Sequence, residues 1–206
     1  MTDALNRLTP LGLMVLTLLD EGDMHPYEMI RLMRMRRDDR LVTITNGTVY
    51  HTVARLERAG LVAEVGVDRE GNRPERTTYA VTDAGARAAA DWVRRELPRV
   101  DRPAEFRVAL AEAHNLDRGE VIDLLAARRT ELEAARDALA DGHRFARHKG
   151  VPDQYLLEVD RDEVMLAADL AWLDGLLARL ADPDFAWGPD PEPSERYLAQ
   201  RKAARL

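Results

Sequence analysis

The stretch TNGTVYHTVARLERAG, residues 45–60, holds the side chains best suited to bind another molecule. Val49, Val53 and Leu56 recur at helical spacing, which predicts an amphipathic helix with one face in a core. Donors and small residues occupy the other positions: Asn46, Gly47, Tyr50, His51, Arg55 and Arg58. Thr45 suits the N-cap and Gly60 suits the C-terminal stop. Such a stripe also occurs on helices that only pack, so the neighbouring segments must decide whether this one binds.

Arginines form a second group with binding chemistry, at the tip of an expected hairpin. Two short segments, 61–67 and 76–81, predict strands on either side of a turn-rich stretch. The tip carries three arginines: Arg69, Arg73 and Arg76. Arginines in this position can clamp phosphates or enter a minor groove. Three acids in the same stretch cancel their charge, so a merely solvated hairpin is the alternative.

Residues that could support catalysis or bind a metal are sparse. The sequence has no Ser-His-Asp order, no glycine-rich phosphate loop and no HExxH. Of the five histidines only His143 and His148 are close, and their spacing of five is poor for sharing a helical face. The absence of cysteine excludes disulfides, cysteine-based zinc sites and thiol catalysis. We therefore expect no enzyme, no metal site and no cofactor.

Three short helices should position the residues of the 45–60 helix. Thr9-Pro10 predicts the start of the first, whose residues 11–19 are apolar nearly all round and too few to span a bilayer. Pro26 predicts the start of the second, and the 45–60 helix is the third. Three helices followed by a hairpin are typical of a winged helix-turn-helix.

In this order the segments resemble the PadR-type transcriptional regulators. The resemblance lies in LTPLGLMVLTLLDEGDMHPYEM, ITNGTVYHTVARLERAGLV and REGNRPERTTYAVTDAG, and it covers about residues 8–90. The chain departs from the family at Pro26, where glycine usually precedes the tyrosine. The resemblance implies that the partner is a double-stranded DNA operator. The start of the third helix would lie at this DNA, and the wing would lie beside the helix. The implied DNA-binding residues are Thr45, Asn46, Gly47, Thr48, Tyr50, His51, Arg55, Arg69, Arg73 and Arg76.

Beyond the hairpin the sequence predicts only helices. Thr82 should cap a helix that ends near Leu97, and a short helix should follow over 104–114. Asp117 should cap a long helix reaching about Phe145, and Asp153 should cap the last one, 154–180. Residues 186–206 are rich in proline and polar side chains, which predicts a loose or peripherally docked tail.

The two long helices carry apolar stripes that need burial. These stripes include Leu132, Leu139, Leu166, Leu170 and Leu173. The resemblance implies that such helices pair across a twofold axis to form a homodimer. It also implies a small aromatic or drug-like effector near that interface. Trp92 and Trp172 are the candidate effector-binding residues, although buried tryptophans more often pack than bind ligands.

Charge limits how the chain could bind DNA. The 206 residues carry a net charge of −7, and most of the acidity lies beyond residue 80. Affinity for DNA must therefore come from local geometry. We expect a mainly α protein with a winged helix-turn-helix domain over 1–97, a helical dimerisation domain over 98–185 and a tail over 186–206.

The expected function is that of a cytoplasmic, homodimeric transcriptional regulator. It would act as a repressor that binds an inverted repeat and is released by an effector. The alternative is a helical protein-interaction adaptor whose winged domain does not bind DNA. We expect no membrane contact.

Overall fold

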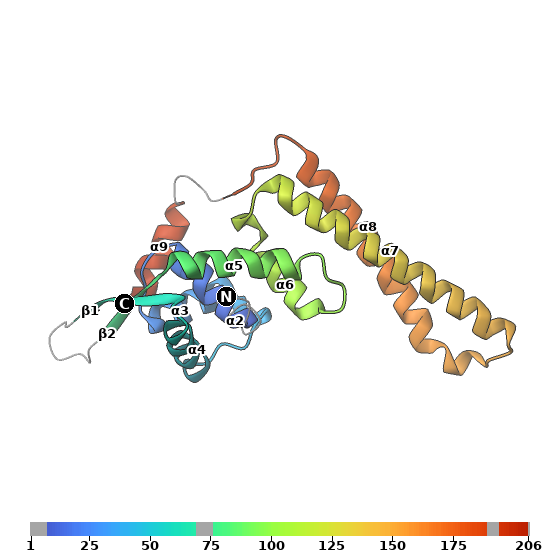
Figure 1. Cartoon of the computed structure of the whole chain (residues 1–206), viewed down its shortest axis with the longest axis horizontal. Helices are drawn as coiled ribbons and strands as arrows, with labels where there is room; N and C mark the ends of the chain where they lie inside the picture. Colours follow the sequence, from blue (N-terminus) through green and yellow to red (C-terminus); the bar gives the residue numbers. More distant parts are fainter. Residues whose placement is uncertain (1–7, 69–75, 189–193, 206) are drawn as a thin grey trace. The chain divides into compact units, whose positions relative to one another are not determined.

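The computed structural model describes residues 8–68, 76–188 and 194–205. The chain divides into two compact units (Figure 1). The first spans residues 1–95, 107–115 and 189–206, and the second spans 96–106 and 116–188. In the described ranges, no helix combines the length and the apolar character that crossing a bilayer requires.

The first unit contains the helices and the hairpin of a winged helix-turn-helix, which confirms the expected fold. Its elements are α2 (Pro10–Asp20), α3 (Pro26–Arg36), α4 (Asn46–Arg58), β1 (Val62–Asp68), β2 (Arg76–Val81), nearly all of α5 (Asp83–Glu96), and α9 (Glu195–Arg205). Helix α2 lies at the centre of this unit's core, since its apolar side chains are buried on every side: Leu13, Met14, Val15, Leu16, Leu18 and Leu19. As expected, the Thr9 hydroxyl caps α2 by accepting from Gly12 N at 3.2 Å.

The junction between the hairpin and α5 is tightly closed. The backbone N–H of Thr82 donates to the Leu61 carbonyl at 3.1 Å. The Thr82 hydroxyl donates to the Gly60 carbonyl at 2.8 Å and accepts from Gly85 N at 3.1 Å, which confirms Thr82 as the cap of α5. A Cβ on Gly85 would lie 2.0 Å from the Leu61 carbonyl oxygen, so only glycine fits where α5 meets the hairpin.

The second unit is built on a hairpin of two long helices, α7 (Arg118–His148) and α8 (Leu157–Ala181), which run side by side in Figure 1. The short helix α6 (Pro103–Ala111) precedes them in the sequence; its residues 103–106 belong to the second unit and its residues 107–111 to the first. Asp117 caps α7 as expected, accepting from Gly119 N at 2.8 Å. The expected cap of α8 is wrong, because Asp153 lies in a separate 3-10 turn, Asp153–Tyr155. Helix α8 begins at Leu157, after this turn. Its N-cap residue is Leu156, whose apolar side chain makes no cap hydrogen bond.

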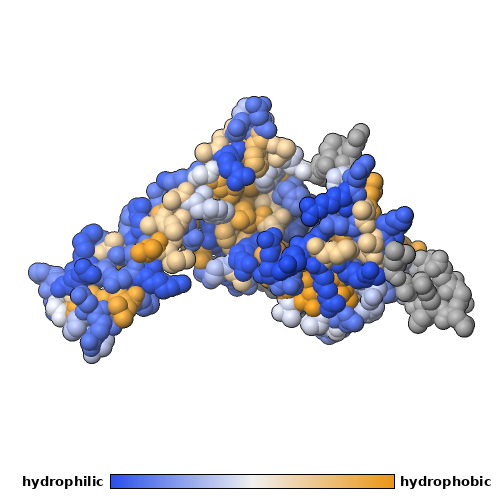
Figure 2. All heavy atoms as spheres, turned by 180° about the vertical axis from the view of Figure 1, so that it is seen from behind, coloured by the Kyte–Doolittle hydropathy of each residue, from blue (hydrophilic) through white to orange (hydrophobic). Residues whose placement is uncertain are grey.

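The stripes of the two long helices are covered in part within one chain. Leu132 of α7 and Leu170 and Leu173 of α8 are buried where the two helices pack on each other, whereas Leu139 and Leu166 are half-buried. A different set of α8 side chains stays exposed: Leu157, Val164, Met165 and Trp172. Figure 2 shows hydrophobic residues at the surface of this hairpin, among hydrophilic ones.

The end of the chain forms α9, which packs against α3 in the first unit. Ion pairs fasten it, since Arg201 Nε and Arg205 Nε lie 3.6 and 3.3 Å from Glu28 Oε1. Both the Glu28 and the Arg201 side chains are only 10% exposed. Within the predicted tail, residues 195–205 therefore form a helix that docks through buried charges.

Candidate nucleic-acid interface

The start of α4 is fixed by a reciprocal pair of threonines. The Thr45 hydroxyl accepts from Thr48 N at 3.1 Å, and the Thr48 hydroxyl accepts from Thr45 N at 3.0 Å. This capping box satisfies two backbone donors that the first turn of a helix leaves without intrahelical partners. Thr45 and Thr48 are exposed, so both threonines shape the helix start at the surface.

The end of α4 is equally well defined. Gly60 adopts a left-handed conformation with φ of 71°, and Leu61 N donates to the Leu56 carbonyl at 2.9 Å. This pairing is the Schellman arrangement, in which glycine follows the last helical turn. Both ends of the predicted helix are thus set by the residues that the sequence indicated.

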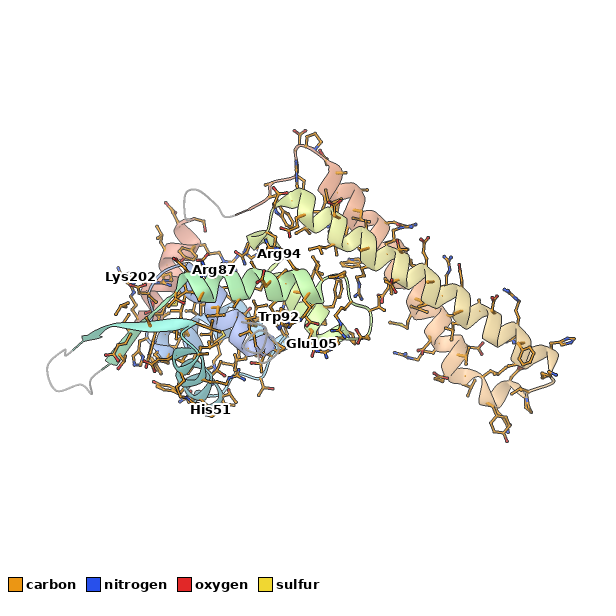
Figure 3. The ribbon with its side chains drawn as sticks, viewed as in Figure 1. His51, Arg87, Trp92, Arg94, Glu105 and Lys202 are labelled. Carbon is orange, nitrogen blue, oxygen red and sulfur yellow. The ribbon has the colours of Figure 1, made fainter. Side chains whose placement is uncertain are left out.

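Helix α4 has one buried face and one exposed face. Val49, Val53 and Leu56 are buried as expected, and Thr52 joins them. The exposed residues of the helix recur every three or four positions: Asn46, Gly47, Thr48, Tyr50, His51, Ala54 and Arg58. Figure 3 shows His51 on the outer side of α4. The predicted binding residues of the helix start therefore share a surface.

Tyr50 lies at the middle of this surface and is held by a neighbour from α3. Its side chain is 45% exposed. The His25 ring meets the Tyr50 ring edge to face, with 6.2 Å between centroids. The same His25 caps α3, since its Nδ1 accepts from Tyr27 N at 3.0 Å. The α3 cap thus positions an aromatic ring of α4, a role for His25 that its isolated place in the sequence did not reveal.

Arg55 is tied to the core side of the helix. Its Nη2 donates to the Thr9 hydroxyl at 2.9 Å, which links α4 to the start of α2. Arg55 is half-buried, whereas Arg58 is exposed and its Nε donates to the Ala54 carbonyl at 3.2 Å. Arg55 therefore helps to hold α4 against the start of α2.

The hairpin has an irregularity that the alternating pattern did not predict. Strand β1 pairs antiparallel with β2, and the register shifts between Glu64 and Gly66. A bulge of this kind turns the following side chain away from its alternating position. Alternation along residues 61–67 predicts that Ala63 and Val65 share an inward face with Leu61, but both are exposed, Val65 by 52%. Ala63 precedes the shift and Val62 is buried instead, so the expected inward face of β1 is wrong. A further bridge joins Met24 to Tyr79, which attaches the hairpin to the turn before α3.

The predicted arginines of the wing cannot be placed at an interface. Arg69 and Arg73 lie outside the described residues, and Arg76 is described only as the first residue of β2. Among the arginines of α3, Arg36 forms a bidentate ion pair with Glu21 at 2.6 and 2.7 Å. Arg36 is thereby neutralised within the unit, whereas Arg34 is exposed.

The two tryptophans singled out as effector-binding candidates have different surroundings. Trp92 is 1% exposed in the first unit, and its indole N–H donates to the Leu8 carbonyl at 3.0 Å. Trp172 is 46% exposed in the second unit and meets the Phe106 ring edge to face at 6.2 Å. The Arg128 guanidinium lies 3.6 Å from the centre of the same Phe106 ring, and burial lowers the pKa of Arg128. Trp172 thus has both open surface and aromatic neighbours, and Trp92 packs in a core.

Comparison with known proteins gives a family for the first unit. Residues 15–91 match the model of the transcriptional regulator PadR-like family. None of the curated proteins compared with the chain matches it.

Several solved structures are similar to the chain. Bacillus subtilis PadR in complex with operator DNA is 19% identical, with 82% of this chain and 98% of that one covered and a TM-score of 0.39. Its complex with p-coumaric acid is 18% identical, with 84% and 100% covered and a TM-score of 0.38. A transcriptional regulator from Clostridium thermocellum is 31% identical, with 39% and 74% covered and a TM-score of 0.33.

Proposed function

Since residues 15–91 place this chain in the PadR-like family of transcriptional regulators, we propose that it is a homodimer that binds an operator in double-stranded DNA through the exposed face of α4. In this proposal each α4 enters a major groove and the wing lies beside it. The contacts come from Asn46, Gly47, Tyr50 and His51, with Thr45 and Thr48 shaping the helix start and Arg55 holding it.

The observation that carries the proposal is an exposed glycine at the start of α4. Gly47 lies in the first turn, and a Cβ there would meet nothing nearer than the Thr45 hydroxyl oxygen at 4.0 Å. Glycine in the middle of a helix costs about 0.5–1 kcal/mol relative to alanine. Among the described residues, no close contact requires a glycine at this first-turn position. A bare backbone at this point lets another molecule approach closely, as a DNA backbone would.

The electrostatics of the helix start agree with a phosphate neighbour. The first turn of α4 contains no acidic residue. Free backbone N–H groups and the helix dipole make an N-terminus favourable to anions. Tyr50, His51 and Asn46 then offer donors along the same face, which suits both phosphate and base edges. This local arrangement compensates for the net charge of −7.

The exposed apolar face of α8 supports the proposed dimer. Leu157 and Val164 are seven residues apart, as are Met165 and Trp172, so the four side chains lie along one side of the helix. Leu157 and Val164 are 66% and 67% exposed. A second copy of α8 would cover this face by twofold symmetry. Twofold symmetry also implies an inverted repeat whose half-sites lie about 10 base pairs apart, or a multiple of that spacing.

The finer parts of the proposal are that the protein is a repressor and that a small aromatic effector releases it. Trp172 supports the second part, because an exposed indole that meets the Phe106 ring edge to face offers an aromatic surface to a flat ligand. Such a ligand must weaken DNA binding by the same factor by which DNA weakens its own binding.

A gel shift with the DNA upstream of the chain's own gene tests the proposal, at low and moderate salt. The wild-type protein should shift a discrete fragment, and Tyr50→Ala should weaken binding by about 1 kcal/mol or more with an unchanged circular dichroism spectrum. Tyr155→Ala is the matched control, since Tyr155 is 70% exposed in the second unit. No shift at either salt concentration would favour the adaptor without DNA affinity.

A further inference from the structure

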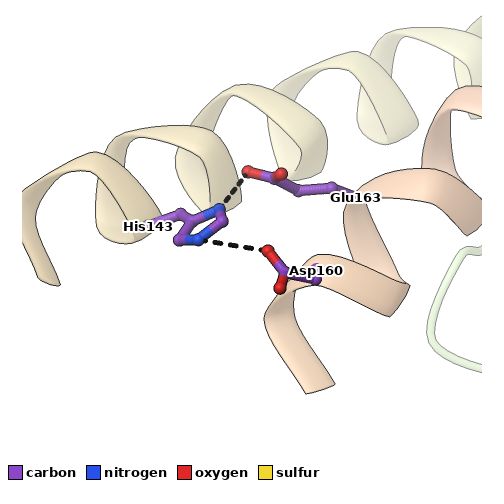
Figure 4. Close-up of side chains that lie close together, drawn as sticks. All are labelled: His143, Asp160 and Glu163. Atoms are coloured by element: carbon purple, nitrogen blue, oxygen red, sulfur yellow. Dashed lines mark hydrogen bonds and ion pairs between the residues drawn. The ribbon is translucent and has the colours of Figure 1, made fainter. Parts of the chain in front are cut away.

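A buried histidine bridges the two long helices near the end of their hairpin (Figure 4). His143 lies on α7, and Asp160 and Glu163 lie one turn apart on α8. His143 Nδ1 is 3.0 Å from Glu163 Oε1, and His143 Nε2 is 3.3 Å from Asp160 Oδ1. Each ring nitrogen therefore faces a different carboxylate.

The cluster combines a buried imidazole with accessible carboxylates. The His143 side chain is 8% exposed, whereas the side chains of Asp160 and Glu163 are 42% and 33% exposed. A solvent ion can thus reach the carboxylates, while the helices hold the imidazole in place. The three potential ligand atoms lie within 4.8 Å of one another.

The distances match one particular way of binding a metal. Ligand atoms around a tetrahedral zinc ion with bonds of about 2.0 Å lie about 3.3 Å apart, which is the separation of His143 Nε2 and Asp160 Oδ1. Glu163 can accept the proton of Nδ1, and a carboxylate in that role fixes the ring and makes the opposite nitrogen a better ligand. The three residues thus supply two ligands and one support for the ring.

We propose that His143, Asp160 and Glu163 form a binding site for a late first-row divalent cation such as Zn²⁺. His143 Nε2 and Asp160 bind the ion, Glu163 orients the imidazole, and water completes the coordination. Mixed imidazole and carboxylate ligands suit zinc and its neighbours, whereas Mg²⁺ and Ca²⁺ prefer oxygen ligands alone. A bound ion would pin the end of α7 to the start of α8.

Arg147 occupies the place that the ion would take. Its Nε lies 2.9 Å from His143 Nε2, and its Nη2 lies 3.6 Å from Asp160 Oδ1. The Arg147 side chain is 56% exposed, so it can move into solvent. The guanidinium and the metal then compete for the same lone pair and the same carboxylate. This competition predicts modest affinity in the natural chain and tighter binding when the arginine is removed.

Calorimetric titration of the untagged full-length protein with Zn²⁺ tests the site. One ion should bind per chain, Mg²⁺ should not compete, and Arg147→Ala should bind Zn²⁺ at least about tenfold more tightly. Glu163→Gln should weaken binding about 10- to 100-fold, as loss of a ligand-orienting carboxylate does. His143→Gln and Asp160→Asn should each abolish the binding.

His148→Gln is the matched control, because His148 is an exposed histidine on the same helix. Zinc should raise the Tm of the wild type and of this control, and should leave the Tm of His143→Gln unchanged. The proposal is overturned if the wild type binds no zinc, or if His143→Gln and Asp160→Asn bind it as tightly as the wild type does. None of these readouts depends on DNA, so the result is separate from that of the proposed function.

Discussion

The apolar side chains of α2 and α8 are buried in different ways. In α2, Leu13 and Leu16 are 0% and 1% exposed, because the first unit surrounds the helix on every side. In α8, Leu173 is 0% exposed but Val164 is 67% exposed, because α7 covers only one side of the helix. The first unit thus completes its core within one chain, whereas the hairpin of the second leaves an apolar face of α8 exposed.

Under the proposed function, the two units do different work. The closed core of the first unit gives α4 the rigid support that fitting a DNA groove needs. The exposed apolar side chains of α8 supply the area through which two chains would join. Changes that disturb closure should therefore unfold the first unit, and changes on the open face of the hairpin should alter assembly while the chain stays folded.

The largest effect is expected at the closed junction of the first unit. Gly85→Ala should lower the free energy of unfolding by about 3 kcal/mol or more, because the new Cβ would lie 2.0 Å from the Leu61 carbonyl oxygen. Gly142→Ala is the matched change in α7, where a Cβ meets no atom of the described structure within 4 Å. It should stabilise the chain by about 0.5–1 kcal/mol. Urea denaturation measures the free energy of unfolding of both variants. Equal changes in Gly85→Ala and Gly142→Ala would contradict the contrast between the two units.

The next effect concerns the open face of α8. Val164→Glu should weaken the dimer by about 3 kcal/mol, since the interface would bury a carboxylate that has no partner. Sedimentation at micromolar concentration should then show a folded monomer. Leu198→Glu replaces another exposed apolar residue, 55% exposed on α9, and should leave the dimer intact. If Val164→Glu sediments as the wild type does, another surface forms the dimer.

A smaller effect is expected where α9 docks on α3. Glu28→Gln keeps a hydrogen-bond acceptor but removes the charge that faces Arg201 and Arg205, so unfolding should require about 1–3 kcal/mol less. Glu195→Gln, an exposed acid on α9, should change stability by less than about 0.5 kcal/mol. Faster amide exchange across α9 in Glu28→Gln would locate the effect, and unchanged exchange with unchanged stability would refute the role of the ion pairs.

The smallest effect concerns a half-buried carboxyl of the first unit. Burial raises the pKa of Glu112, although the His114 charge opposes the shift. The folded state therefore holds this proton to a higher pH than the unfolded state does, so stability falls as pH rises through the folded pKa. Glu112→Gln should stabilise the chain at neutral pH by at most about 1 kcal/mol, and the gain should vanish near about pH 4. Urea denaturation at several pH values measures this gain, and a stabilisation by Glu112→Gln that grows as the pH falls would contradict the raised pKa of Glu112.

Local signals in the sequence predicted much of the first unit. Thr9, Thr45 and Thr82 cap helices as their hydroxyls suggested, and the α4 stripe faces the core. These features depend on residues a few positions apart, so a single sequence contains them. The inward face expected for β1 is wrong, since Ala63 and Val65 are exposed and Val62 is buried. The register shift between Glu64 and Gly66 depends on how two strands pair, which the pattern along one strand does not contain.

The features that sequence reading missed depend on residues far apart in the chain. His143 meets Asp160 and Glu163 only because α7 and α8 fold back on each other. The docking of α9 joins Arg201 to Glu28, which no local pattern connects. The sequence shows Asp160 and Glu163 three residues apart near the start of α8. Their partner His143 is identifiable only from the packing of α7 on α8.

Hydroxyl-radical footprinting of the protein on the DNA upstream of its own gene tests the central claim most directly. Two copies of α4 in a twofold dimer should protect two stretches of backbone, related by symmetry and centred about 10 base pairs apart or a multiple of that spacing. Both protections should be lost together in Tyr50→Ala and in Val164→Glu. A single protected stretch, or a footprint that the Tyr50→Ala protein retains in full, would contradict the account.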